Sequence, residues 1–310
     1  MRILIVGAGA IGGYYGSRFL QAGADVTFLV RPGRRARLDA DGLSVRSDLG
    51  DFDGPVNSIS SDELKTPFDV IVLSCKAYDL DAAIQDIRPA VGPDSVILPF
   101  LNGLGVYDRL DAEFGRDRVL GGVAYIAVTL GSDGVNRHAG TNDVVVVGAR
   151  SAAGEPQAAA LHALFARSAG LRSHASDIVH ALWNKWVMLA SGAMMNCLMR
   201  GTVADILASR DGERLMRQAM SECRNVAQAE GIALSTADVE KLEARLLDRG
   251  SGWAASMMRD IAQGAHRIEA DAIVGDMLDR AERHGLDVPL LRTAFCHLQV
   301  YEKQNRRKTE

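Results

Sequence analysis

Apolar runs and polar stretches alternate along the first half of the chain in an order that predicts a βαβ unit. Residues 2–6 (RILIV) form a short apolar run rich in β-branched side chains, which is typical of a strand buried on both faces. A glycine-rich turn follows at residues 7–12, and residues 14–22 have the spacing of a helix that ends near Gly23. A second apolar run at residues 25–30 completes the strand–helix–strand pattern.

The same alternation continues to about residue 167. Further strands are expected at residues 68–74, 95–100, 119–128 and 143–147, and helices at residues 80–91 and 106–114. Strands that alternate with helices predict a parallel sheet covered by helices on both faces. We therefore expect an α/β domain at residues 1–170, with a Rossmann-type doubly wound sheet.

After about residue 175 the strand-like runs disappear and helical spacing takes over. Helices are expected at residues 178–199, 202–230, 236–249 and 269–284. Ser235 is expected to cap the third of these helices. The pattern predicts an all-α C-terminal domain at residues 171–310.

Composition and charge narrow the class of protein. Lys and Arg number 35 and Asp and Glu 39, so the net charge of −4 argues against a nucleic-acid or membrane-surface binder. Hydrophobic residues make up 47% of the chain and charged residues 24%, which is typical of a globular protein. The four cysteines stand singly, which favours a reduced, cytoplasmic protein without a metal site. No apolar run reaches the roughly 18 residues that a membrane span needs.

The glycine turn has the spacing of a dinucleotide-binding site. Gly7 allows the tight turn, Gly9 lets the backbone approach a pyrophosphate, and Gly12 permits close helix–strand packing. The helix that follows presents free N–H groups to phosphates. The alternative is a tight turn that binds no ligand. The cofactor contacts expected from this turn are Gly7, Ala8, Gly9, Ala10, Ile11 and Gly12.

The end of the second strand favours NADP over NAD. An NAD site usually has an acidic residue about 20 positions after the glycines, on the ribose hydroxyls. Here Arg31 occupies that region, and a guanidinium pairs well with a 2′-phosphate. Arg37 fits a solvated helix face better, whereas Arg34 and Arg35 are open to either interpretation.

Two polar residues follow predicted strands at the sheet edge where ligands bind. Lys76 could meet anionic groups of cofactor or substrate, and Asn102 could orient a ribose or a substrate oxygen. Each also has a simpler interpretation, Lys76 as a surface residue at a helix start and Asn102 as a turn residue.

In the helical half, Lys185 stands among apolar residues. A lysine on a mostly buried helix face is costly unless it points into a polar cleft, and partial desolvation lowers its pKa and suits it to proton donation. The alternative is that its ammonium group reaches solvent. Polar islands at residues 256–260 and 267–271 supply further candidates, but spacing alone does not choose between Glu269 and Asp271.

Taken together, these residues resemble the 2-dehydropantoate 2-reductase (ketopantoate reductase) family over nearly the whole chain. The motifs that carry the resemblance are GAGAIG at 7–12, CKA at 75–77, LNGLG at 101–105, LWNKW at 182–186, SMMRD at 256–260 and IEAD at 268–271. The family reduces 2-dehydropantoate to (R)-pantoate with NADPH, on the route to pantothenate and coenzyme A. The resemblance implies a Rossmann domain followed by a helical domain.

The resemblance also implies roles for individual residues. Lys185 would protonate the substrate carbonyl, and Glu269 would hold the substrate or its developing hydroxyl and also contact the cofactor. Asn102 would lie between the nicotinamide ribose and the substrate, and Ser256 would contact the substrate carboxylate. The resemblance further makes Lys76 and Arg31 cofactor contacts, with Arg31 on the 2′-phosphate.

Two departures from the family pattern keep other functions open. Many members carry asparagines one and two turns after the catalytic lysine, where this chain has Leu189 and Ala193, and its first asparagine downstream is Asn196. The spacing from Asp260 to Glu269 is also one residue longer than expected. The alternatives are a reductase of another 2-oxo acid or ketone, such as an opine-type or 3-hydroxyacid dehydrogenase, and a non-catalytic NADPH-binding protein.

The expected partner is a small-molecule 2-oxo acid, with no nucleic acid and no membrane. The apolar helical half is compatible with a homodimer, although the helices of a monomer's core have the same pattern.

Overall fold

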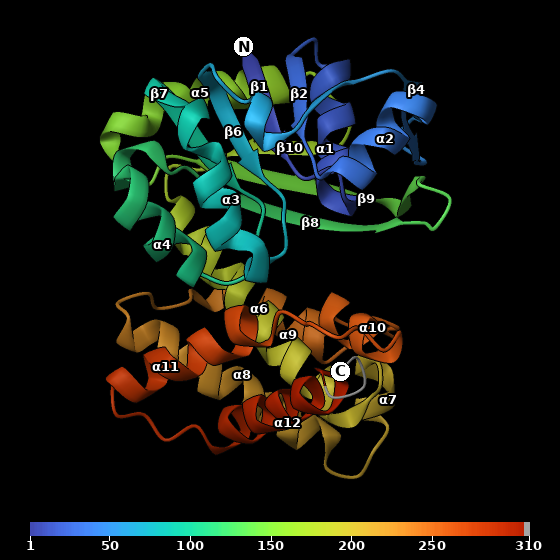
Figure 1. The fold of residues 1–310 in the computed structure, drawn as a ribbon. Coiled ribbons are helices and arrows are strands. Elements are labelled where there is room, and N and C mark those ends of the chain that lie inside the picture. Colours follow the sequence, from blue (N-terminus) through green and yellow to red (C-terminus); the bar gives the residue numbers. More distant parts are fainter. Residues whose placement is uncertain (307–310) are drawn as a thin grey trace. The chain divides into compact units, whose positions relative to one another are not determined.

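The structure, a computed structural model, describes residues 1–306, and the chain forms two compact units (Figure 1). The first unit contains Met1–Leu101 and Val106–Ala181. The second contains Asn102–Gly105 and the chain from Leu182 onward. The short segment Asn102–Gly105 therefore belongs to the second unit, although the residues on both sides of it belong to the first.

The central sheet of the first unit is entirely parallel, as the βαβ pattern predicts. Its strands, in order across the sheet, are β5 (Asn57–Ile59), β2 (Asp25–Leu29), β1 (Arg2–Val6), β6 (Phe68–Leu73) and β7 (Val91–Pro99). The helices that connect these strands or follow them are α1 (Ala10–Gln21), α2 (Pro32–Asp41), α3 (Leu80–Ile87) and α4 (Gly105–Phe114). Residues 3–6 of β1 are buried because β1 is a central strand of a parallel sheet, and the structure covers both faces of such a sheet.

The expectation that residues 119–128 and 143–147 extend this parallel sheet is wrong. They belong to β8 (Gly121–Leu130) and β9 (Asn136–Gly148), which pair antiparallel as a long hairpin. The turn between them is too short for the crossover that parallel strands require. The hairpin forms a second, mixed sheet with β3 (Leu43–Arg46), β4 (Phe52–Gly54) and β10 (Leu171–His174).

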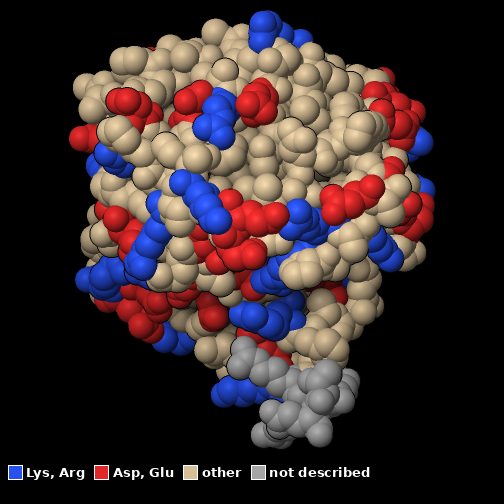
Figure 2. Space-filling view, turned by 45° about the horizontal axis from the view of Figure 1, so that its top comes forward, with Lys and Arg blue, Asp and Glu red and all other residues tan. Residues whose placement is uncertain are grey.

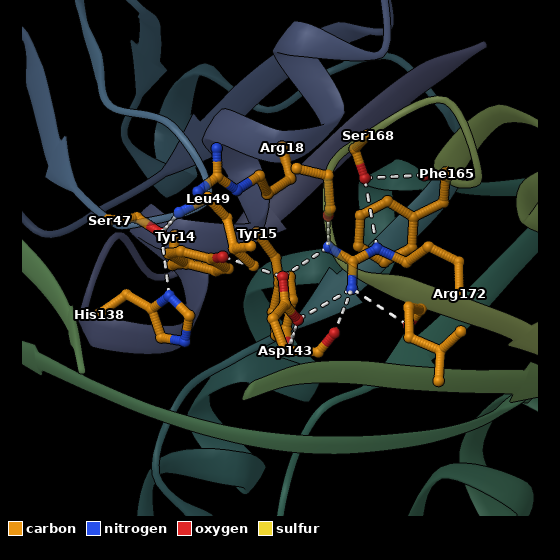
Figure 3. A network of polar contacts seen from close by, with 12 residues as sticks. Tyr14, Tyr15, Arg18, Ser47, Leu49, His138, Asp143, Phe165, Ser168 and Arg172 are labelled. Atoms are coloured by element: carbon orange, nitrogen blue, oxygen red, sulfur yellow. Dashed lines mark hydrogen bonds and ion pairs between the residues drawn. The ribbon is translucent and has the colours of Figure 1, made fainter. Parts of the chain in front are cut away.

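Helix α1 contacts strands of both sheets, and aromatic side chains fill the space between them. The ring of Phe19 stacks on Phe165, from α5 (Glu155–Phe165), with centroids 4.2 Å apart. A buried polar cluster lies beside the ring of Phe165 (Figure 3). At its centre Asp143 accepts hydrogen bonds from the hydroxyls of Tyr14 and Tyr15, at 2.9 and 3.1 Å, and from the Arg172 guanidinium.

The second unit is helical. Its helices are α6 (Ile178–Met199), whose first turn lies in the first unit, α7 (Val203–Leu207), α8 (Gly212–Ala229), α9 (Thr236–Leu246), α10 (Ser256–Ala262), the π-helical turn η6 (Asp271–Gly275), α11 (Asp276–Arg283) and α12 (Pro289–Arg306). Ser235 caps α9 as predicted, since its hydroxyl accepts the Asp238 N–H at 3.2 Å.

Two expected helices differ from prediction. The helix expected at residues 202–230 is divided, because a turn at residues 208–211 separates α7 from α8. A Cβ at Gly212 would overlap the Ile206 carbonyl oxygen, so the turn closes this tightly only with glycine there. The helix expected at residues 269–284 begins with η6, so its first turn is wider than an α-helical turn.

The surface mixes the two signs of charge. In the view of Figure 2, Lys and Arg side chains are interspersed with Asp and Glu side chains rather than gathered by sign. Among the helices in residues 1–306, none is both long and apolar enough to cross a membrane.

Candidate functional site

The three glycines of the first turn occupy three different environments. Gly7 has a φ of +92°, which strongly favours glycine, and its N–H donates to the Leu29 carbonyl at 2.9 Å. A Cβ at Gly12 would overlap the Gly7 carbonyl oxygen, so α1 packs on the turn only with glycine there. A Cβ at Gly9 would meet no atom within 4 Å. Open space therefore lies over Gly9, where the backbone could approach a ligand.

The N-terminus of α1 fits an anionic group. Its N-cap is Gly9, which has no side chain to cap the helix, and the first turn carries no acidic residue. No acidic side chain of this first turn therefore neutralises the positive end of the helix dipole. These features suit the pyrophosphate of a dinucleotide.

The arginines after β2 have different partners. Arg31 is the N-cap of α2, and its well-exposed guanidinium forms an ion pair with Asp79 at 3.1 Å. Arg35 pairs with Glu63 and Asp39. The carboxylates leave Arg35 with little capacity for a ligand, whereas Arg31 keeps most of its donors in solvent.

Arg34 is the arginine that contacts the glycine turn. Its Nε donates to the Ala8 carbonyl at 2.9 Å, and its buried Nη2 has no hydrogen-bond partner in the described part of the chain. Burial lowers the pKa of Arg34, and the neighbouring Arg37 lowers it further. A buried guanidinium nitrogen without a partner is costly, and a phosphate beside the turn would satisfy it. The sequence left the role of Arg34 open, and only the fold reveals this contact.

Lys76 lies at the carboxyl-terminal edge of the parallel sheet. It follows β6 in extended backbone as the N-cap of the short helix η2 (Ala77–Asp79). Nearby, the Ser74 hydroxyl donates to the carbonyls of Val6 and Gly7, at 2.9 and 3.0 Å. The segment that carries Lys76 is thus tied directly to the glycine turn.

Lys185 and Asn102 form a hydrogen-bonded pair within the second unit. The Lys185 ammonium donates to Oδ1 of Asn102 at 3.3 Å. Burial lowers the pKa of Lys185 from 10.5 to about 8, and the Glu269 carboxylate opposes this change through its negative charge. Glu269 itself is buried, just before η6. A lysine with this pKa can donate a proton near neutral pH.

Ser256 is the first residue of α10 and is not a member of the Lys185–Asn102 pair. Asn196 determines the backbone position just before it, since its Oδ1 accepts the Ala255 N–H at 3.1 Å. The other end of the Asn196 amide donates to the Gly201 carbonyl at 2.7 Å. Asn196 is therefore occupied in holding the backbone. Within residues 1–306, no cluster of His, Cys, Asp and Glu is suited to a metal ion.

Sequence reasoning missed the contacts that hold the segments carrying Asn102 and Lys185. The Gly105 N–H donates to Oδ2 of Asp276 at 2.9 Å, and the indole N–H of Trp186 donates to the Ile273 carbonyl at 3.0 Å. No spacing or motif links residues so far apart, and the carbonyl that the indole contacts belongs to the π turn η6. A π turn inside a helix is rare and often marks a functional site.

Comparisons with known proteins agree with this architecture. Residues 3–152 match the family described as "Ketopantoate reductase PanE/ApbA". Residues 177–302 match the family described as "Ketopantoate reductase PanE/ApbA C terminal". An uncharacterized oxidoreductase, YkpB of Bacillus subtilis (strain 168), is 32% identical over 304 residues, which cover 98% of this chain and 100% of that protein.

Solved structures extend the comparison. The crystal structure of 2-dehydropantoate 2-reductase from Geobacter metallireducens GS-15 has a TM-score of 0.87 at 30% identity, covering 96% of this chain and 99% of that one. The ternary structure of D-mandelate dehydrogenase with NADH and anilino(oxo)acetate has a TM-score of 0.89 at 20% identity and covers 99% of each chain. At that identity the second match shows a shared fold alone.

The two family matches together cover residues 3–152 and 177–302, and the match to YkpB covers 98% of this chain. The resemblance inferred from the sequence motifs is confirmed. This chain belongs to the ketopantoate reductase family of oxidoreductases.

Proposed function

We propose that this protein reduces 2-dehydropantoate to (R)-pantoate with NADPH, in the route to pantothenate and coenzyme A. The observation that carries the proposal is the Lys185 ammonium, which has a pKa of about 8 and is hydrogen-bonded to Asn102. Lys185 is the proton donor to the substrate carbonyl oxygen. Glu269 binds the developing hydroxyl, and its negative charge keeps Lys185 more fully protonated.

The remaining residues bind and orient. Asn102 aligns the ammonium with the carbonyl oxygen, and Ser256 contacts the substrate carboxylate. When bound, the nicotinamide cofactor supplies the hydride. The protein's own contribution is position and charge, which together lower the barrier without a covalent intermediate.

We assign the cofactor to the first unit. The turn Gly7–Gly12 and the N-terminus of α1 hold the pyrophosphate, which the open space over Gly9 and the unpartnered Arg34 nitrogen support. Lys76 contributes a further cation. Arg31 binds the 2′-phosphate that distinguishes NADPH from NADH, and the exposure of its guanidinium leaves donors available for this.

A second candidate is the reduction of a different 2-oxo acid, one with an apolar side chain. Leu189 and Ala193, one and two turns after Lys185 on α6, are buried and apolar. Asn196 offers no substitute amide, because backbone groups occupy both of its ends. Beside Leu189 and Ala193, an apolar substrate side chain would be accommodated better than a hydroxyl group.

The test follows absorbance at the nicotinamide band after the protein is mixed with NADPH and 2-dehydropantoate. Parallel samples replace the acid with 2-oxo acids that have apolar side chains, and replace NADPH with NADH. Preference for 2-dehydropantoate and NADPH supports the proposal, whereas preference for an apolar acid supports the second candidate. Tight NADPH binding without turnover of any acid would contradict both and indicate a cofactor-binding protein.

A further inference from the structure

The segment Asn102–Gly105 is held by residues from the far end of the chain. Gly103 has a φ of +86°, and a Cβ there would overlap the Ala272 carbonyl oxygen, so the backbone of the segment lies directly against η6. Two residues later, the Gly105 N–H donates to Oδ2 of Asp276 at 2.9 Å. The segment that carries Asn102 is therefore fixed by the turn η6–α11 at two points.

Asp276 is itself held by a buried arginine. Arg280 donates from Nε to Oδ1 of Asp276 at 3.1 Å, and from Nη1 to Oε2 of Glu230 at 2.7 Å. The Arg280 guanidinium also lies over the rings of Trp183 and Trp186, 5.7 and 5.5 Å from their centroids. With both partners and rings around it, Arg280 has little freedom to move.

The same turn also holds the helix that carries Lys185. Trp186, the next residue on α6, donates its indole N–H to the Ile273 carbonyl of η6 at 3.0 Å. One side of the Lys185–Asn102 hydrogen bond is thus anchored to η6 through Trp186. The other side is anchored to η6 and α11 through Gly103 and Gly105.

We propose that Asp276 is a positioning residue of the reductase. Its carboxylate, held by Arg280, accepts the Gly105 N–H and so keeps the Asn102 side chain within hydrogen-bonding distance of the Lys185 ammonium. The inference rests on the proposed function, in which Lys185 donates the proton, and it adds a residue that contacts neither substrate nor cofactor.

Both carboxylate oxygens of Asp276 are used, one by Arg280 and one by the Gly105 N–H. Replacement by alanine leaves both donors without this partner and releases the segment that carries Asn102. The Lys185 ammonium then loses an acceptor, so its pKa falls further below that of the wild type. Glu269 is the charged group that acts on Lys185, and this change leaves it in place.

The test compares Asp276→Ala and Asp276→Asn with Asp279→Ala, a control that removes an exposed acid from the same helix. We expect kcat of Asp276→Ala to fall by about 10- to 100-fold, because a small misplacement of a catalytic group has an effect of that size. NADPH affinity should stay unchanged. Asp276→Asn retains an oxygen for the Gly105 N–H, although its NH2 group cannot accept from Arg280, so it should recover part of kcat. Asp279→Ala should match the wild type.

A double variant separates positioning from a general loss of structure. If Asp276 acts through Asn102, then Asp276→Ala combined with Asn102→Ala should be no slower than Asn102→Ala alone. Multiplied losses in the double variant, or equal losses in Asp276→Asn and Asp276→Ala, would overturn the inference.

A readout that needs no substrate makes this inference testable apart from the proposed function. The chain has six lysines, so the Lys185 signal in the NMR spectrum of ¹³C-lysine-labelled protein can be identified by its loss in Lys185→Ala. Its titration should shift to lower pH in Asp276→Ala and in Asn102→Ala, and stay near the wild type in Asp276→Asn. An unshifted Lys185 titration in Asp276→Ala would contradict the inference even in an active enzyme. If the wild type reduces no 2-oxo acid, the proposed function fails, yet the titration still decides whether Asp276 positions Asn102 against Lys185.

Discussion

Lys185 and Asn102 are 83 residues apart in the sequence, yet the ammonium of one lies 3.3 Å from the amide oxygen of the other. Both belong to the same compact unit, because the segment Asn102–Gly105 packs with the helices rather than with the parallel sheet that it follows. The distance between the two side chains is therefore set within the second unit. Its chemistry follows from burial, which lowers the pKa of Lys185 to about 8.

The rate of reduction should depend on pH through Lys185. The proton donor must be charged, so kcat/KM should be level below pH 8 and fall about tenfold per pH unit well above it. If Lys185 had its ordinary pKa of 10.5, kcat/KM would begin to fall more than two pH units higher. Initial rates measured between pH 6 and 10.5 locate the pH at which kcat/KM begins to fall. A fall that begins only near pH 10.5 would contradict the assignment of Lys185 as the proton donor.

Lys185→Met should stabilise the fold while it abolishes reduction. The folded-state pKa lies below the ordinary value, so below about pH 8 the folded protein bears the full cost of a buried charge, and that cost disappears as the pH rises to 10.5. The difference of about 2.5 pKa units corresponds to at most roughly 3 kcal/mol. Urea unfolding at pH 7 should give Lys185→Met a larger free energy of unfolding than the wild type, and this difference should shrink toward pH 10.5. If Lys185→Met were less stable than the wild type at pH 7, the charged Lys185 ammonium would not reduce the stability of the wild-type fold.

Gly9→Ala should separate cofactor binding from folding. The new methyl group meets no atom of the protein within 4 Å, so the melting temperature should stay close to that of the wild type. It projects into the space assigned to the pyrophosphate, and an overpacked contact of about 1–3 kcal/mol would weaken NADPH binding roughly 5- to 150-fold. Gly12→Ala, whose Cβ overlaps the Gly7 carbonyl, should lose stability as well. Calorimetric titration with NADPH makes the comparison, and undiminished affinity in Gly9→Ala would place the cofactor elsewhere.

Asp143→Ala should be among the most destabilising single changes in the first unit. Asp143 and Arg172 form an ion pair with side chains 0% and 2% exposed, and Tyr14 and Tyr15 donate to the same carboxylate (Figure 3). Removal of one partner leaves the guanidinium buried without its charge partner, which costs about 3–5 kcal/mol. The matched control is Asp133→Ala, which breaks the exposed pair with Arg137 and should cost less than about 1 kcal/mol. Equal losses in denaturant unfolding would contradict this account of the cluster.

The features that the sequence predicts well are local in origin. A β-branched run, a glycine turn and a helical apolar face are adjacent in the chain, so β1, the turn and α1 follow from short-range pattern. The second sheet was missed because β9 continues well before residue 143, and the polar residues there pair with β8 instead of forming a loop. The pairing, not the composition, determines these strands.

In the candidate site, too, the local sequence indicates some residues, whereas other contacts arise only in the folded chain. The local sequence around each residue indicates Lys185 and Asn102 as candidates, and the fold brings the two together. The bond from Gly105 to Asp276 spans 171 residues and rests on one backbone N–H, which no residue pattern reveals. Asn196 illustrates the converse, since its amide is available in the sequence but occupied by the backbone in the structure.

The most direct test of the central claim compares the wild type with Lys185→Ala, each saturated with NADPH, on addition of 2-dehydropantoate. The account predicts equal NADPH affinity in the two proteins, rapid cofactor oxidation by the wild type, and a rate at least about 100-fold lower in the variant. Oxidation at the wild-type rate by Lys185→Ala would contradict the assignment of Lys185 as the proton donor.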